Sequence, residues 1–124
     1  MSISKYSIYA PSLVRISLSL LFLWFGINQI FYAENFFGYV PDYLINYWVT
    51  IVFWNGIFET IAGGLLLMGY FTRSVSLVLG VHLFFITLSL GYNDIAVRDF
   101  CFMLITFSVA LGGADKWCLD KRFL

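Results

Sequence analysis

The stretch FWNGIFETIAGGLLLMGYFTR, residues 53–73, is an apolar run that carries one acidic side chain near its middle. A bilayer-spanning α-helix needs about 20 mostly apolar residues, and this run supplies them. In a helix, Gly56, Glu59 and Gly63 fall on one face, and Asn55 lies one turn before Glu59. The stretch therefore predicts a membrane helix whose carboxyl group faces other helices rather than lipid.

The composition of the whole chain agrees with a membrane protein. Its 124 residues are 61% hydrophobic and 11% charged, with a mean hydropathy of +0.89. An ordinary soluble domain has about 25% charged residues. Seven acidic and seven basic residues are too few to cover a water-facing surface of this size. The net charge of zero gives no electrostatic reason to expect nucleic acid as a partner.

Four apolar runs are long enough to span a bilayer, and they cover residues 12–32, 49–69, 74–93 and 96–113. None shows strand alternation, which argues against a barrel. No small-x-small cleavage site follows the first run, so we expect it to be retained. Short turns make neighbouring helices antiparallel. We predict an all-α fold, an integral membrane antiparallel four-helix bundle, with 1–124 as one domain.

The connection between the first two spans, residues 33–48, is rich in aromatic residues and contains Pro41. Tyrosine and tryptophan favour the membrane–water boundary. We expect an interfacial segment with a short amphipathic helix after Pro41. The segment is either a simple connector or a lid over a pocket.

The charges are divided unequally between the two ends of the predicted bundle. One end collects both termini and the turn near residue 70, with the basic residues Lys5, Arg15, Arg73, Lys116, Lys121 and Arg122. The other end has Arg98 as its one basic residue. The positive-inside rule therefore predicts a multi-pass protein with both termini in the cytoplasm.

Polar residues within the predicted spans are expected to meet inside the bundle, and they are Asn28, Asn55, Glu59, His82 and Arg98. Exposing one ionised side chain at the bilayer centre costs about 2.5–3.5 kcal/mol on insertion scales. Facing inward lets these groups satisfy one another. Small residues such as Gly26 and Gly80 would allow the helices to approach closely.

Two interpretations of this inner cluster are open. Glu59 is either a hydrogen-bonded link between helices or a proton-carrying group in a pocket, with His82 as its relay or as a packing residue. Arg98 and Asp99 either anchor the outer end of the fourth span or bind an anion or a quinone carbonyl. With Asn28 and Asn55, they complete the candidate ligand-binding set.

The remaining candidate residues suggest no chemistry of their own. Arg15 and Arg73 are expected to anchor the topology near the lipid headgroups. No second histidine or cysteine lies at ligand spacing from His82, so we predict no metal site. Cys101 and Cys118 form no CxxC pair, and a disulfide between them is not expected.

Three segments together resemble the DoxX family: RISLSLLFLWFGINQI at 15–30, FETIAGGLLLMGYFTRSVSLVL at 58–79 and VRDFCFMLITFSVALGGADKWCLD at 97–120. The run from Glu59 to Arg73, with its paired glycines and Thr-Arg end, is the most specific part. The resemblance implies a small four-helix inner-membrane protein. Related members are quinone-linked subunits of membrane oxidoreductases, and many have no assigned activity.

From the resemblance we expect a quinone-interacting or membrane-anchoring subunit of an oxidoreductase system. The sequence has no haem, flavin or iron–sulfur signature, so no covalently bound cofactor is expected and electrons would come from a soluble or membrane redox partner. Whether the chain is itself an enzyme stays open, as does a homo-oligomer. The alternative is a non-enzymatic membrane carrier or interaction protein whose polar cluster only fixes the bundle.

Overall fold

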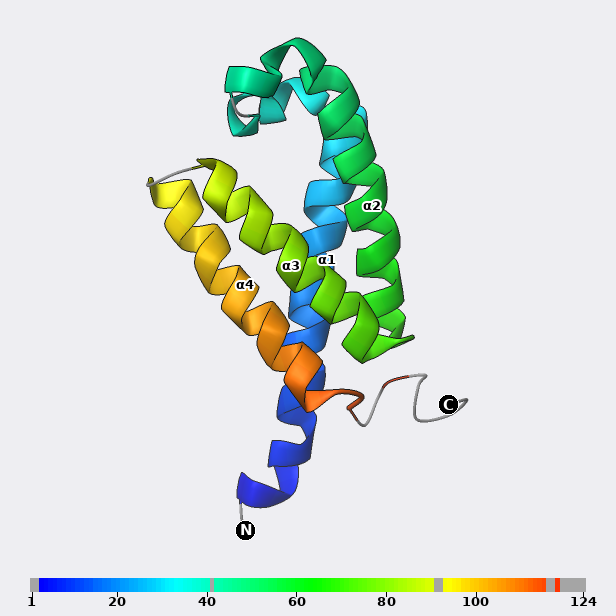
Figure 1. Cartoon of the computed structure of the whole chain (residues 1–124). Coiled ribbons are helices and arrows are strands. Elements are labelled where there is room, and N and C mark those ends of the chain that lie inside the picture. The colour runs from blue at the N-terminus through cyan, green and yellow to red at the C-terminus, as the bar shows by residue number, and fades with distance from the viewer. Residues whose placement is uncertain (1–2, 41, 91–92, 116–117, 119–124) are drawn as a thin grey trace.

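The computed structural model describes residues 3–40, 42–90, 93–115 and 118. Four long helices dominate it (Figure 1). They are α1 (Ala10–Phe31), α2 (Trp48–Met68), α3 (Thr72–Leu90) and α4 (Asp94–Gly112). Each is long and apolar enough to cross a membrane. The described residues contain no strand, and the predicted all-α four-helix bundle is confirmed, with helix ends within three residues of the predicted spans.

Three short 3-10 helices complete the fold. The first, η1 (Ile3–Tyr9), precedes α1, while η2 (Ala33–Tyr39) and η3 (Asp42–Tyr47) form the connection to α2. This connection lies at the end of the bundle opposite the N-terminus (Figure 1). The expected short helix between the first two spans is therefore present as 3-10 turns, although Pro41 lies outside the described residues.

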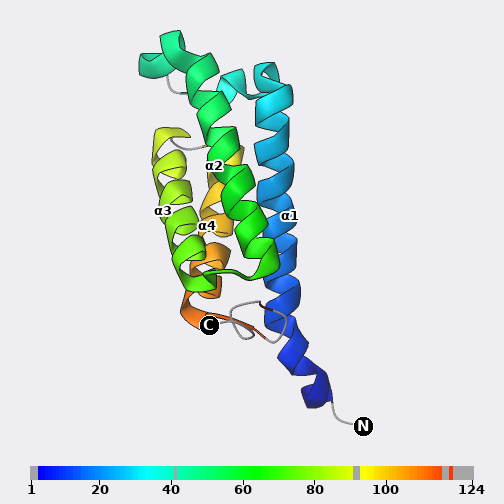
Figure 2. The same cartoon turned by 90° about the vertical axis from the view of Figure 1, so that its right-hand side faces the viewer.

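The four helices pack as two pairs. The most extensive contacts join α1 to α2 and α3 to α4, and those between the pairs are sparser. Two views at right angles show the same pairing (Figures 1 and 2). Leu18, Phe22, Leu66, Leu79 and Leu83 form the apolar core that joins the pairs.

Glycines bring α1 and α2 into close contact. A Cβ atom on Gly56 would lie 2.8 Å from the carbonyl oxygen of Gly26 and 2.9 Å from the Cβ of Gln29. Between α3 and α4, a Cβ atom on Gly80 would lie 2.6 Å from the ring of Phe107. Apolar side chains gain little by leaving lipid for a helix interface, so backbone proximity of this kind supplies much of the attraction. The close approach expected at Gly26 and Gly80 is confirmed.

The turn between α2 and α3 is formed by a left-handed glycine and two backbone hydrogen bonds. Gly69 has a left-handed φ of 73°, a conformation that costs glycine little. Its N–H donates to the Leu66 carbonyl, and the Tyr70 N–H donates to the Leu65 carbonyl. This pair of bonds is a Schellman motif, which ends α2 and turns the chain back.

Gly56→Ala should weaken the bundle, whereas Gly64→Ala should not. An added methyl group at Gly56 meets backbone that cannot move independently, and overpacking of this kind costs about 1–3 kcal/mol. At Gly64, on the same helix, no atom lies within 4 Å of the new Cβ. Thermal unfolding of both variants in one detergent checks the difference, and equal midpoints would contradict the packing described here.

Candidate functional site

A cavity of about 270 Å³ lies between the two helix pairs, near η2 and η3. Its walls are mostly apolar and include several phenylalanines. Its polar side chains come from all four helices: Gln29 of α1, Asn55 and Glu59 of α2, His82 and Ser89 of α3, and Arg98 and Asp99 of α4. An apolar cavity with a few convergent polar groups is the usual form of a small-molecule site.

Glu59 is the centre of the polar cluster in this cavity. Glu59 is 4% exposed. Gln29 Nε2 donates to Glu59 Oε2 at 2.9 Å, and Asn55 Nδ2 donates to Glu59 Oε1 at 3.2 Å. The same Asn55 nitrogen also donates to Gln29 Oε1 at 2.7 Å, which closes the cluster across the α1–α2 interface. The carboxyl group is thus held by neutral amides within the bundle.

His82 brings the third helix to this carboxyl group. Its Nε2 lies 3.4 Å from Glu59 Oε1, a distance at which a protonated imidazole would form an ion pair. The atom is buried and has no hydrogen-bond partner among the described residues. Its ring packs against Phe58 at a centroid distance of 4.7 Å. A buried nitrogen without a partner is costly, and a bound ligand or water would satisfy it.

Arg98 and Asp99 form the fourth helix's contribution. Arg98 Nη2 lies 3.2 Å from Asp99 Oδ1, and the guanidinium carbon lies 5.3 Å from the centre of the Phe25 ring. The Arg98 side chain is 39% exposed, whereas Asp99 is buried. The pair therefore sits on the cavity wall, with the guanidinium partly exposed and next to Phe25 of α1.

The η2–η3 segment covers part of the cavity. Phe36 and Val40 are buried and pack with Val52 of α2, and Leu44 also lines the cavity. The segment therefore contributes wall to the site, as a lid would, in addition to connecting two helices.

Sequence reasoning named the wrong amide on α1. Asn28 was expected in the inner cluster, but its Nδ2 donates at 2.7 Å to the Trp24 carbonyl of its own helix, and it does not line the cavity. Gln29 occupies the position beside Glu59 that was expected for Asn28. The signal was available, because Phe22, Gly26 and Gln29 recur at the three- and four-residue spacing of one buried face.

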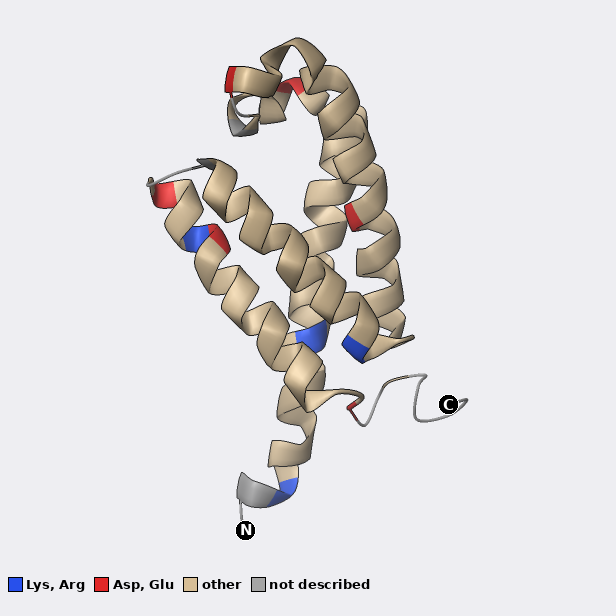
Figure 3. Cartoon of the chain, in the orientation of Figure 1, with Lys and Arg blue, Asp and Glu red and all other residues tan. Residues whose placement is uncertain are grey.

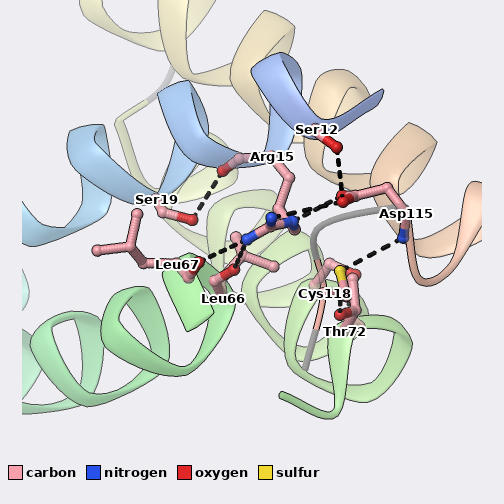
Figure 4. Close-up of polar contacts among 9 residues, drawn as sticks. Ser12, Arg15, Ser19, Leu66, Leu67, Thr72, Asp115 and Cys118 are labelled. Atoms are coloured by element: carbon pink, nitrogen blue, oxygen red, sulfur yellow. Dashed lines mark hydrogen bonds and ion pairs between the residues drawn. The ribbon is translucent and has the colours of Figure 1, made fainter. Parts of the chain in front are cut away.

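A second polar cluster lies at the opposite end of the bundle and was missed (Figure 4). Arg15 was expected near the lipid headgroups, but it is 1% exposed. Its Nε lies 2.6 Å from Asp115 Oδ2, and Ser12 Oγ donates to Asp115 Oδ1 at 2.7 Å. The headgroup role of Arg15 is therefore wrong, since the guanidinium is used inside the protein.

Arg15 also donates hydrogen bonds to the last carbonyl groups of α2. Its Nη1 donates to the carbonyl oxygens of Leu66 and Leu67 at 2.8 and 2.6 Å. The last carbonyls of a helix lack intrahelical partners and carry partial negative charge, so a buried cation there is favourable. Because Asp115 follows α4, one side chain joins α1, the end of α2 and the segment after α4.

Cys118 extends this second cluster toward α3. Its buried sulfur lies 3.4 Å from Thr72 Oγ1 and accepts the Asp115 backbone N–H at 3.3 Å. Both Cys101 and Cys118 are free thiols, as expected. Arg73 is exposed at the start of α3, with its guanidinium beside Gly113.

Fold and site together define a small four-helix integral membrane protein with a polar cluster inside an apolar cavity. The family model DoxX matches residues 10–91, which is more than half of the chain, so the chain belongs to the DoxX family. The matched region runs from α1 through α3, and α4 follows it. No curated protein and no solved structure matches the chain.

Asp115→Ala should strongly destabilise the bundle. Removing one partner of a buried ion pair leaves the other charge uncompensated and costs about 3–5 kcal/mol. The double variant Arg15→Met with Asp115→Ala should recover part of that loss, since no buried charge is left alone. Thermal unfolding in detergent measures both.

Asp42→Ala serves as the control, because Asp42 is an exposed acid in η3. If Asp115→Ala were no more harmful than Asp42→Ala, the buried pair would not support the fold.

Proposed function

We propose that this DoxX-family protein binds the head group of a quinone in the cavity, as the membrane subunit of an oxidoreductase system. The observation that carries the proposal is the polar cluster of Glu59, Gln29, Asn55 and His82 inside a cavity with aromatic and aliphatic walls. A quinone has the matching form, with a flat apolar ring and carbonyl oxygens at its edge.

The side chains fit such a head group. His82 Nε2 is the buried atom that lacks a partner, and an imidazole nitrogen can donate to a carbonyl oxygen or accept from a hydroxyl group. Arg98 of α4 also lines the cavity, and its guanidinium, which carries N–H donors only, would hold a second carbonyl oxygen.

A bound quinone would supply the redox chemistry, since its reduction consumes two electrons and two protons. Glu59 would carry one proton between its carboxyl group and the ligand, with His82 as the relay 3.4 Å away. Gln29 and Asn55 would hold the carboxyl group in position in both protonation states, because amides can donate and accept. Electrons would come from a redox partner, as the chain's own residues offer no electron carrier.

Structural linkage is the second candidate function. Gln29 and Asn55 connect Glu59 across the α1–α2 interface, which is what a purely structural hydrogen-bond cluster would do. A non-enzymatic carrier or interaction protein would need nothing more from these residues. Stability separates the two when the whole cluster is replaced by Gln29→Leu, Asn55→Leu and Glu59→Leu together. A cluster kept only for structure should then be destabilised, whereas one kept for function should leave stability equal or higher.

Gln29→Ala should weaken quinone binding, and Asn28→Ala should not. The two amides are neighbours on α1, but Gln29 alone bonds to Glu59 and lines the cavity. Without Gln29 the Glu59 carboxyl group loses one of the amides that hold it and the cavity loses part of its polar wall, so Kd should rise about tenfold. Binding of a short-chain benzoquinone to the purified protein in nanodiscs gives the comparison.

Glu59→Gln tests whether Glu59 carries a proton when the quinone is reduced. This variant keeps the size and shape of the side chain but cannot ionise, and its NH2 group replaces one of the two oxygens that accept from Gln29 and Asn55. It should retain binding while losing proton uptake when the quinone is reduced by an added donor. Proton uptake equal to that of the wild type would reject the proton-carrying role of Glu59.

We propose the inner membrane as the location, with both termini cytoplasmic. Among the described residues, exposed Lys5 lies in η1 and exposed Arg73 at the start of α3, at the end with the N-terminus. Glu34 and Asp42 lie in η2 and η3, and Asp94 begins α4, at the other end. Figure 3 shows the Lys and Arg positions in blue and the Asp and Glu positions in red. Lys116, Lys121 and Arg122, which strengthened this prediction, lie outside the described residues.

In whole cells, a membrane-impermeant maleimide should label Glu34→Cys and spare Lys5→Cys, each made without the native cysteines. Both positions are exposed and lie at opposite ends of the bundle. The reverse labelling would invert the orientation.

A further inference from the structure

A groove between α1 and α4 lies beside the cavity. It has a volume of about 560 Å³ and shares two wall residues, Leu21 and Phe102, with the cavity. Among neighbouring helices, α1 and α4 make the least extensive contact. The two spaces are therefore adjacent, and they meet where α1 and α4 make sparse contact.

The groove lies on the lipid-facing side of the helices. It runs along α1 from Leu21 to Leu13, and eight residues at 1.5 Å each give about 12 Å. Leu13 and Ile105 are exposed on its borders. Its polar members are Ser17 and Ser108, whose small side chains leave the space between the helices open.

From this adjacency we infer that the ligand is an amphiphile with a long apolar tail, whose head occupies the cavity and whose tail leaves through the α1–α4 groove. The inference rests on the proposed function and adds to it the class of quinone, a lipid-tailed one, and its route. A tail gains little by exchanging lipid for an apolar groove, because both are equally apolar. The groove acts as an exit that lets the head bind without bending the tail back into the cavity.

Two quinones with the same head test the exit. One is 2,3-dimethoxy-5-methyl-1,4-benzoquinone, and the other carries a decyl tail. In the double variant Ser17→Phe, Ser108→Phe the groove is filled but the cavity residues are unchanged. Binding to the whole chain in nanodiscs should weaken about tenfold or more for the decyl quinone and stay within about twofold for the tail-less one.

Val78→Phe is the matched control, because Val78 is 52% exposed on α3 and lines neither space. It should leave the binding of both quinones unchanged. Equal affinity of the filled-groove variant and the wild type for the decyl quinone would overturn the inference. That result would leave the proposed function intact as long as the head binds.

Failure of the wild type to bind either quinone would instead reject the proposed function, together with the inference that rests on it. A photoreactive diazirine at the tail end gives a second readout that needs no variant. It should label residues near Leu13 on α1 and Ile105 on α4. Labelling confined to residues 33–48 would place the tail at the opposite end and overturn the inference.

Discussion

Hydrocarbon offers no hydrogen bonds, so every polar side chain on these four helices needs a partner within the protein. The structure meets this constraint with two buried clusters, one around Glu59 and one around Arg15. Between them the helices are held by apolar packing and by close glycine contacts such as that of Gly26 with Gly56. The arrangement of the bundle follows from where those partners are found: the first cluster joins α1, α2 and α3, and the second joins α1, α2 and the segment after α4.

The two clusters differ in how completely their groups are satisfied, and that difference suggests different roles. Arg15 meets a carboxylate and two helix-terminal carbonyls in tight geometry, and both charges are almost fully buried. Such a closed cluster rigidifies one end of the bundle. The Glu59 cluster borders a cavity and includes His82, whose Nε2 has no partner among the described residues. A half-satisfied network is less stable than a closed one, which makes it the better candidate for ligand contact.

The sequence was sufficient to predict the fold because apolar run length alone defines spans, and short turns fix their directions. Glu59, Asn55, His82 and Arg98, which the sequence placed within the bundle, line the cavity, although the Arg98 side chain is 39% exposed. The prediction failed where one residue of rotation decides the answer, since Asn28 and Gln29 are adjacent amides and only Gln29 shares a face with Phe22 and Gly26. It failed at Arg15 for another reason: the partner, Asp115, is 100 residues away in the segment after α4, and no local pattern predicts so distant a pairing.

Retention of a carboxyl group at Glu59 is more easily explained by chemistry than by stability. Replacing a buried polar network by apolar residues of similar volume is often neutral or stabilising, so structure alone gives weak reason to keep an acid there. The neighbouring glycines already bring α1 and α2 together. A carboxyl group does one thing that an amide or an apolar side chain cannot, which is to take up and release a proton inside a dry cavity. That capacity, beside an imidazole, is what the proposed binding of a quinone would use.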